Sequence, residues 1–253
     1  MDYGLTGRRV AVIGANRGIG FDVAKAFLEQ KTKLYIASEN PDVMQARDRL
    51  NELADDGCEV QAVQFDIADR SQVFAAFETI GELDVLVVNS GLFSKTLPDD
   101  LSDACFDRFI KQINVNIVGH WNCVQAAVPR MKDGARIILT ASIWGLVGGQ
   151  EYAAYTASKH GVLGLMKSLA MDLGPRGISV NAVNPGSIGT EMNLKELSQE
   201  RQAALASQMW LRPALIPPSK LVGAYLFLAS DHASEITGQS ISVDRGQTIA
   251  GAC

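Results

Sequence analysis

The chain has 253 residues, of which 47% are hydrophobic and 20% are charged, and its formal net charge is −5. This composition is typical of one folded domain, and no basic block suggests nucleic acid or an anionic membrane as a partner. Because no signal peptide, apolar span, repeat or linker is visible, we expect a single soluble domain over residues 1–253. Neither CxxC pairs nor metal-ligand spacing occurs, so reduced thiols in a cytoplasm and no metal site are expected for Cys58, Cys105, Cys123 and Cys253.

The first predicted element is an apolar strand, Arg9–Ile13, which runs directly into the glycine-rich stretch Gly14–Gly20. Its spacing is GxxxGxG, and an amphipathic helix is predicted after it over about 18–30. Glycines let the backbone turn tightly and approach a pyrophosphate, and the helix directs its N-terminal amides at the phosphates. Such a stretch alone can be only a turn, but the strand before it and the helix after it favour a phosphate site.

Further strands are predicted over Lys33–Ala37, Val60–Phe65 and Asp84–Val88, with a helix starting near Pro41. Strands that alternate with helices indicate a parallel sheet with helices on both faces. We therefore expect an α/β, doubly wound (Rossmann-type) fold with about seven strands. Ser38 and Glu39 follow the second strand, where such folds read the adenosine ribose.

A long amphipathic helix is predicted over about 102–132, with Asn116 buried in its middle. A buried asparagine usually satisfies a polar group, which can be a backbone partner or a held water. After it, the run 137–139 is predicted as a buried strand that ends near Ser142. A serine there would face the ligand site of an open α/β sheet, or would merely satisfy the backbone of a turn.

Tyr155 and Lys159 are four residues apart, which places them on one face of a predicted helix over about 152–174. A nearby ammonium favours phenolate, so the pKa of Tyr155 is expected to fall below its usual value of about 10. Tyr155 could then exchange a proton near neutral pH. The pair alone is weak evidence, because this spacing also occurs on many solvated helices.

A strand over Ile178–Asn184 leads to the tight turn Pro185–Gly186. Residues 187–216 follow as an irregular and partly helical segment at the site end of the sheet. We interpret this segment as a substrate lid, although a packed surface excursion would give the same pattern.

The sequence resembles the short-chain dehydrogenase/reductase family, in its short single-domain branch, over nearly the whole chain. The matching features are the glycine-rich turn, Asn89-Ser90-Gly91, Ser142 with Tyr155-x-x-x-Lys159, and Pro185-Gly186. The resemblance implies that Tyr155 is the general acid/base, Lys159 tunes it and binds the nicotinamide ribose, Ser142 binds the reacting oxygen and Asn116 holds a relay water. It further implies that Asp66 and Ile67 flank the adenine and that Ile188 and Thr190 hold the carboxamide. The cofactor-binding residues expected on these grounds are Gly14, Asn16, Arg17, Gly18, Ile19, Gly20, Ser38, Glu39, Asp66, Ile67, Asn89, Gly91, Tyr155, Lys159, Pro185, Gly186, Ile188 and Thr190.

Three residues depart from the family pattern. Ile13 stands where Thr is usual, Ser90 where Ala is usual, and Arg245 where a C-terminal motif has its first glycine. We expect the first two to change loop hydrogen bonds without abolishing cofactor binding. Arg245 follows the last strand, which in relatives approaches a subunit interface.

The expected function is hydride transfer between a nicotinamide cofactor and a secondary alcohol or ketone. The alternatives are a catalytically silent binding or regulatory protein on the same fold, and an isomerase or dehydratase. An apolar substrate pocket is expected from Ser142, Trp144, Tyr152, Met192 and Trp210, which favours a neutral, moderately apolar substrate.

The cofactor is expected to be NAD, in preference to NADP. Arg17 could bind a 2′-phosphate, whereas the charge of Glu39 would repel one, and the two could instead pair with each other. The predicted helices over 102–132 and 152–174 carry surplus apolar surface, so a homotetramer, or failing that a dimer, is expected.

Overall fold

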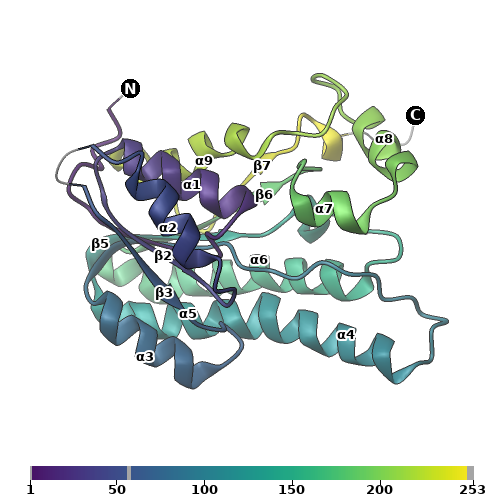
Figure 1. Cartoon of the computed structure of the whole chain (residues 1–253), viewed down its shortest axis with the longest axis horizontal. Helices are drawn as coiled ribbons and strands as arrows, with labels where there is room; N and C mark the ends of the chain where they lie inside the picture. The colour runs from purple at the N-terminus through teal and green to yellow at the C-terminus, as the bar shows by residue number, and fades with distance from the viewer. Residues whose placement is uncertain (1, 56–57, 250–253) are drawn as a thin grey trace.

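The computed structural model describes residues 2–55 and 58–249, and in this part of the chain one sheet of seven strands runs through the molecule (Figure 1). The strand order is β3-β2-β1-β4-β5-β6-β7, and every neighbouring pair is parallel. The strands are β1 Arg9–Ile13, β2 Lys33–Ser38, β3 Val60–Gln64, β4 Leu83–Val88, β5 Met131–Thr140, β6 Ser179–Pro185 and β7 Ser240–Val243. The order reverses between β1 and β4, which creates a crevice at the carboxyl ends of these strands.

Helices cover both faces of this sheet, as the doubly wound prediction required (Figure 1). One core lies between the sheet and α1, α2 and α9, and the other lies against α3, α5 and α6. Because both faces are covered, the central strands are mostly buried, and β4 buries five of its six residues. The helices are α1 Gly18–Glu29, α2 Val43–Asn51, α3 Arg70–Ile80, α4 Asp103–Ile113, α5 His120–Ala127, α6 Ala153–Leu173, α7 Glu191–Glu196, α8 Gln199–Ser207 and α9 Val222–Ala229.

The long helix predicted over about 102–132 is not one regular α-helix. A π-helical segment, Asn114–Gly119, separates α4 from α5, and Asn116 lies inside it. The chain then passes through a short 3₁₀ turn, Val128–Arg130, and enters β5 at Met131, so the predicted helix ran too far. Proline in this turn lacks a backbone N–H for helix continuation, which is consistent with the helix ending here.

Other predicted boundaries differ by a few residues. The prediction placed a helix start near Pro41, whereas α2 begins at Val43. The strand predicted at 137–139 is part of the buried end of β5, and residues 132–134 before it are exposed and lack an apolar signal. Residues 187–216 contain α7 and α8 and return beside the start of this segment through a bridge between Ile188 and Ile216.

Three general properties bear on function. In residues 2–55 and 58–249, no helix is long and apolar enough to cross a membrane. The same residues contain no group of three or more His, Cys, Asp or Glu side chains that could hold a metal ion. Cys58, Cys105 and Cys123 are free thiols, and Cys253 lies outside the described residues.

Candidate active site

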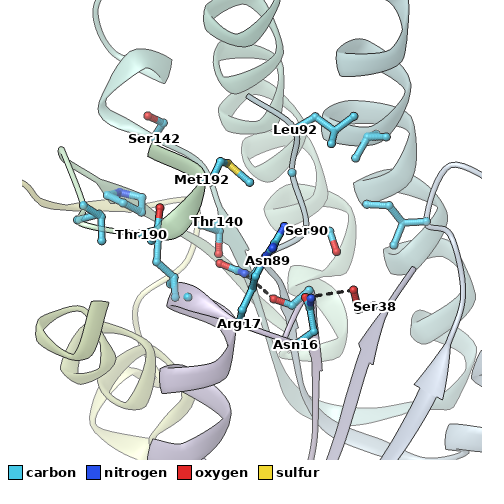
Figure 2. Close-up of a pocket in the computed structure, with 18 of the residues that line it drawn as sticks. Asn16, Arg17, Ser38, Asn89, Ser90, Leu92, Thr140, Ser142, Thr190 and Met192 are labelled. Carbon is cyan, nitrogen blue, oxygen red and sulfur yellow. Dashed lines mark hydrogen bonds between the residues drawn. The ribbon is translucent and has the colours of Figure 1, made fainter. Parts of the chain in front are cut away.

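The carboxyl ends of the strands open into a cavity of about 250 Å³ (Figure 2). Figure 2 shows Ser38 and Ser142 at opposite ends of it, with Asn89 and Thr140 between them. The predicted site residues that line this cavity are Gly14, Asn16, Arg17, Gly18, Ile19, Ser38, Glu39, Asp66, Ile67, Asn89, Gly91, Ser142, Tyr155, Lys159, Pro185, Gly186, Ile188, Thr190 and Met192. Gly20 and Asn116 lie behind its wall rather than on it.

The glycine-rich turn forms a close-packed cradle. Gly14 has φ of +85°, and a Cβ there would lie 2.6 Å from the Ser90 nitrogen. A Cβ on Gly20 would lie 1.9 Å from the carbonyl oxygen of Gly14, so the turn can close only on glycine. No side chain of the described residues caps α1, which leaves the amides of its first turn available to an anion. These features fit a pyrophosphate.

Ile13 and Ser90, two of the departures from the family pattern, take part in the loop through their backbone groups. The carbonyl oxygen of Ile13 accepts hydrogen bonds from the amides of Asn89 at 2.8 Å and Ser90 at 3.1 Å. The Asn89 side chain in turn donates to the carbonyl of Gly14 at 2.9 Å. The connection between the β1 and β4 ends therefore rests on backbone groups and Asn89, while the side chain of Ile13 is fully buried.

At the adenosine end of the cavity, the hydroxyl of Ser38 is already engaged. It donates to Oδ1 of Asn16 at 3.1 Å and accepts from the amide of Asn40 at 3.1 Å (Figure 2). A hydroxyl has one proton and two lone pairs, so Ser38 can accept one further hydrogen bond but has no proton left to donate.

The suggested pairing between Arg17 and Glu39 is wrong. Arg17 donates instead to Glu191, in the first turn of α7, at 2.9 Å. Glu191 also binds Lys195 at 3.1 Å, and these two cations hold the pKa of the Glu191 carboxyl below its usual range. Arg17, Glu39 and Glu191 all line the same cavity, and the ion pair that forms is the one between Arg17 and Glu191. The glycine-rich turn is thereby linked to the segment 187–216.

Tyr155 and Lys159 lie on α6 on one face, as predicted, with the Lys159 ammonium 5.5 Å from the centre of the Tyr155 ring. Lys159 donates to the carbonyl oxygen of Thr140 at 2.8 Å, which anchors it to the end of β5. The Thr140 hydroxyl shares a 2.8 Å hydrogen bond with the hydroxyl of Tyr225 on α9. The catalytic helix is thus tied to the central strand and, through it, to the opposite layer.

The expectation that Lys159 lowers the pKa of Tyr155 is wrong for the protein as the structure has it. Burial raises the pKa of Tyr155 to about 12, with Ser142 acting weakly in the opposite direction. Burial also lowers the pKa of Lys159 to about 7. Desolvation therefore outweighs the attraction between the two groups, since the ammonium bonds Thr140 rather than the phenol.

Asn116 is satisfied by protein groups. Its side chain exchanges two hydrogen bonds with the backbone of Leu92, at 2.8 and 2.9 Å, and donates to Ser158 at 3.0 Å. These contacts fit the backbone-partner interpretation of this residue. A Cβ on Gly91 would lie 3.4 Å from Oδ1 of Asn116 and 3.5 Å from Nζ of Lys159, so the β4 loop, α6 and the π-helical segment meet here.

A second cavity of about 50 Å³ adjoins the first, and Ser142 and Tyr155 line both. Trp144 and Phe93 lie in its wall, as do Asn193, Leu197 and Leu205 from the segment 187–216. Phe93 is stacked on Tyr152 with ring centres 4.4 Å apart and contacts Trp144 at 5.5 Å. The small cavity is thus an aromatic pocket that opens at Ser142 and Tyr155.

Two predicted substrate residues lie elsewhere. Tyr152 is 1% exposed and supports Phe93 from behind the pocket wall. Trp210 is 67% exposed and lines neither of the two cavities. Its aromatic character suggested a pocket, but its position depends on how residues 208–214 pack against the turn after β7, which local sequence does not reveal.

Sequence reasoning missed several lining residues, of which Phe93 and Glu191 matter most. Phe93 could have been found, because it follows Asn89-Ser90-Gly91 at a strand end, where ligand-facing residues gather. Glu191 follows Thr190 directly, but its partner Arg17 is 174 positions away, and no local pattern connects them. The remaining missed residues are Asn40, Phe65, Ser90, Leu92, Val115, Thr140, Ala141 and Asn193 in the large cavity and Ile143, Ser187, Leu197 and Leu205 in the small one.

Known proteins share this architecture and sequence. A family model described as enoyl-(acyl carrier protein) reductase matches residues 14–248. The L-rhamnose 1-dehydrogenase (NAD(P)(+)) of Azotobacter vinelandii is 39% identical, over 96% of this chain and 97% of its own. The trans-4-hydroxycyclohexanecarboxylate dehydrogenase of Sinomonas cyclohexanicum is 36% identical, over 95% of this chain and 93% of its own.

A solved structure agrees with these relatives. A protein described as an NAD(P)-dependent gluconate 5-dehydrogenase of Beutenbergia cavernae, with bound NADP, superposes with a TM-score of 0.90 at 29% identity. The match covers 99% of this chain and 100% of that one. Together with the cradle, the Ser142, Tyr155 and Lys159 set and the strand order, these matches show that the chain belongs to the short-chain dehydrogenase/reductase family and is an NAD(P)-dependent oxidoreductase.

Proposed function

We propose that this protein interconverts a small secondary alcohol and its ketone at the junction of the two cavities. The observation that carries the proposal is that Ser142 and Tyr155 line both cavities, so that a substrate in the small one meets a cofactor in the large one. The cofactor, when bound, supplies or accepts the hydride. A silent binding protein is not favoured, because the side chains needed for proton transfer are present and face the opening.

In the oxidation direction, Tyr155 accepts the proton of the substrate hydroxyl while the C–H bond of the substrate releases a hydride. Ser142 donates a hydrogen bond to the same oxygen and holds it beside the phenol. Lys159, fixed by Thr140 with its ammonium 5.5 Å from the centre of the Tyr155 ring, would pass the proton on and bind a ribose hydroxyl. Asn116 positions the Leu92 backbone beside Lys159. In the reduction direction each transfer is reversed.

The pocket favours a compact substrate with an apolar face. It offers about 50 Å³ beside Phe93 and Trp144, with Asn193 as a polar group beside the catalytic pair. Aromatic walls of this kind contact the C–H face of a ring while the hydroxyl turns toward Ser142. The two relatives above act on L-rhamnose and on a hydroxycyclohexane carboxylate, which supports a six-membered ring as the substrate skeleton. We therefore propose a small cyclic secondary alcohol.

The direct test is a panel of cyclic and open-chain secondary alcohols with NAD and with NADP, followed by absorbance of the reduced nicotinamide. We expect turnover with cyclic alcohols and little with long-chain substrates. Phe93→Ala should raise KM for the best cyclic alcohol about tenfold, because a contact of one aromatic ring is lost. Absence of turnover across the whole panel would contradict the proposal.

The structure supports NAD as the preferred cofactor. The proton of Ser38 is committed to Asn16, so Ser38 can accept from a ribose 2′-hydroxyl but cannot donate to a 2′-phosphate. Arg17 is neutralised by Glu191, and Glu39 adds a negative charge at the same end of the cavity. A comparison of kcat/KM for NAD and NADP tests this preference, and a tenfold advantage for NADP would overturn it.

Residues 187–216 are proposed as the substrate lid. Asn193, Leu197 and Leu205 contribute to the small cavity, and Thr190 and Met192 to the large one. Movement of this segment would therefore open both cavities together. We further propose a homotetramer in a reducing, cytoplasmic compartment, supported by the exposed apolar side chains of α4 and α5 and the free thiols among the described residues.

A further inference from the structure

The turn after β7, residues 244–248, holds both ends of the proposed lid. Gln247 donates to the hydroxyl of Ser187 at 3.1 Å and accepts from the Ser187 amide at 3.2 Å. Its amide group also donates to the Gln208 side chain at 3.4 Å. Ser187 begins the segment and Gln208 directly follows α8, so one side chain connects the lid's departing and returning arms.

Arg245 makes the remaining contacts with the returning arm. Its carbonyl accepts from the amides of Trp210 at 3.0 Å and Leu211 at 3.1 Å. Its guanidinium donates to the carbonyl of Arg212 at 3.0 Å and to that of Ala214 at 2.6 Å. Four hydrogen bonds from one residue therefore hold the stretch that returns from α8 to Ile216.

The backbone at Arg245 is in a conformation that ordinary residues avoid. Its φ is +54°, and Arg212, whose carbonyl it binds, has φ of +64°. Glycine adopts this region at no steric cost, whereas a residue with a side chain adopts it only with strain. A side chain retained against such strain is a pointer to function when it makes contacts that glycine cannot. Here those contacts are the two guanidinium bonds to the returning arm.

The turn itself is rigid enough to act as an anchor. Asp244 is 7% exposed, and its carboxylate accepts from the amides of Gly246 at 2.9 Å and Thr248 at 3.0 Å. A Cβ on Gly186 would lie 2.7 Å from Cα of Asp244, so the turn is packed directly against the end of β6. The turn 244–248 is therefore packed against the end of the sheet, and it can hold the lid in place.

We propose that Arg245 is a positioning residue for the substrate lid, which it clamps over the Ser142 and Tyr155 pocket through the carbonyls of Arg212 and Ala214. The inference rests on the proposed role of residues 187–216 as the lid. Ser142 follows the end of β5 and Tyr155 lies on α6, so loss of the clamp should affect substrate binding and leave the chemical step largely intact.

Three variants separate the clamp from backbone strain. Arg245→Ala removes the guanidinium bonds and keeps a side chain at positive φ. Arg245→Gly removes both the bonds and the strain. Arg212→Gly is the matched control, because it relieves a positive φ in the same arm while its carbonyl can still accept from Arg245.

Both Arg245 variants should raise KM for the alcohol about three- to tenfold, with kcat within about twofold of wild type, since charged hydrogen bonds in a partly exposed site are lost. Arg212→Gly should keep the wild-type KM. Arg245→Gly should melt at a higher temperature than Arg245→Ala, because the backbone strain is relieved. Its KM for the alcohol should nevertheless be raised as much as that of Arg245→Ala. If KM instead followed the melting temperature across the three variants, the role would be structural and the proposal would fail.

A second measurement needs no substrate. Limited digestion of the full chain with chymotrypsin reports lid opening through cleavage after Trp210, because Trp210 is 67% exposed and the substitutions leave the Trp210–Leu211 bond intact. Cleavage there should be faster in both Arg245 variants and unchanged in Arg212→Gly. Equal cleavage in all four proteins would overturn the clamp even if the alcohol panel succeeds. Faster cleavage without turnover of any alcohol would support the clamp and contradict only the proposed function.

Discussion

At the scale of single residues, the phenol of Tyr155 has the most specific role. It stands at the junction of the two cavities with Ser142 beside it, and no other phenol lines the larger cavity in the described chain. Tyr155→Phe removes only the hydroxyl, so we expect kcat to fall by at least about 10²-fold because the proton acceptor is gone. Cofactor binding, measured by fluorescence of the reduced nicotinamide, should stay within about threefold of wild type. Near-normal kcat in this variant would contradict the assignment.

The ionisation of Tyr155 should depend on its surroundings. Burial raises its pKa to about 12, so in the free protein it should remain protonated through pH 10. A positive charge nearby favours phenolate, and the oxidised nicotinamide ring carries one. Ultraviolet titration, with Tyr155→Phe as the reference, should therefore show tyrosinate at lower pH when NAD is present. Identical titration with and without NAD would show that Lys159 or Ser142 alone controls the phenol.

Cofactor preference should depend on Glu191. An exposed ion pair is worth about 0.2–1 kcal/mol, which corresponds to a factor of about 1.4 to 5 in affinity. Glu191→Gln would release Arg17 and should improve kcat/KM for NADP by about that factor, with NAD unchanged. Lys195→Gln is the matched control, because it removes the competing partner and should leave Arg17 paired. An equal gain for both cofactors would show that Arg17 serves the shared pyrophosphate.

At the scale of elements, sequence alone was sufficient for the glycine-rich turn and for most of the strands, but it found only the buried end of β5. The central strands carry continuous apolar runs. Gly14 has a positive φ, which glycine adopts without strain. The π-helical segment around Asn116 could not be predicted, because its apolar pattern matches that of an α-helix. The partner of Arg17 could not be predicted either, because an ion pair between the first and last thirds of the chain depends on how the lid folds back.

His120, the first residue of α5, gives this region a pH dependence. It is fully buried, neither ring nitrogen has a hydrogen-bond partner among the described residues, and burial lowers its pKa from 6.5 to about 3. Between pH 6.5 and about 3, His120 is therefore protonated in the unfolded chain and neutral in the folded chain. Its contribution to stability is fully present above pH 6.5 and is lost as pH falls toward 3.

We expect this histidine alone to remove about 1.4 kcal/mol of stability per pH unit between about pH 6 and 4. His120→Gln removes the titrating group, so its urea-unfolding free energy should depend less on pH over that interval. The exposed His160 provides the control, and His160→Gln should keep the wild-type slope. Equal slopes in wild type and His120→Gln would show that other groups govern acid unfolding.

At the scale of the whole molecule, α3, α4, α5 and α6 form the layer on one side of the sheet (Figure 1), and this layer leaves apolar side chains exposed. Its exposed side chains are Phe106 at 65%, Ile110 at 40%, Val118 at 41%, Trp121 at 41% and Met171 at 79%. Apolar side chains gathered on one layer in this way mark a surface for protein association. The layer on the opposite face of the sheet contains α1, and the association proposed below does not involve that layer.

We therefore expect a homotetramer, or failing that a dimer, that buries this layer between copies of the chain. Phe106→Glu with Trp121→Glu would place charges in an apolar interface, and light scattering at micromolar concentration should then show a smaller species. Leu53→Glu is the control, because Leu53 is 55% exposed but lies beyond α2 in the other layer. A wild type that is monomeric under the same conditions would refute the assembly. If the double variant is monomeric and still binds NAD with wild-type affinity, each subunit forms its cofactor site alone, as the single-chain cavity implies.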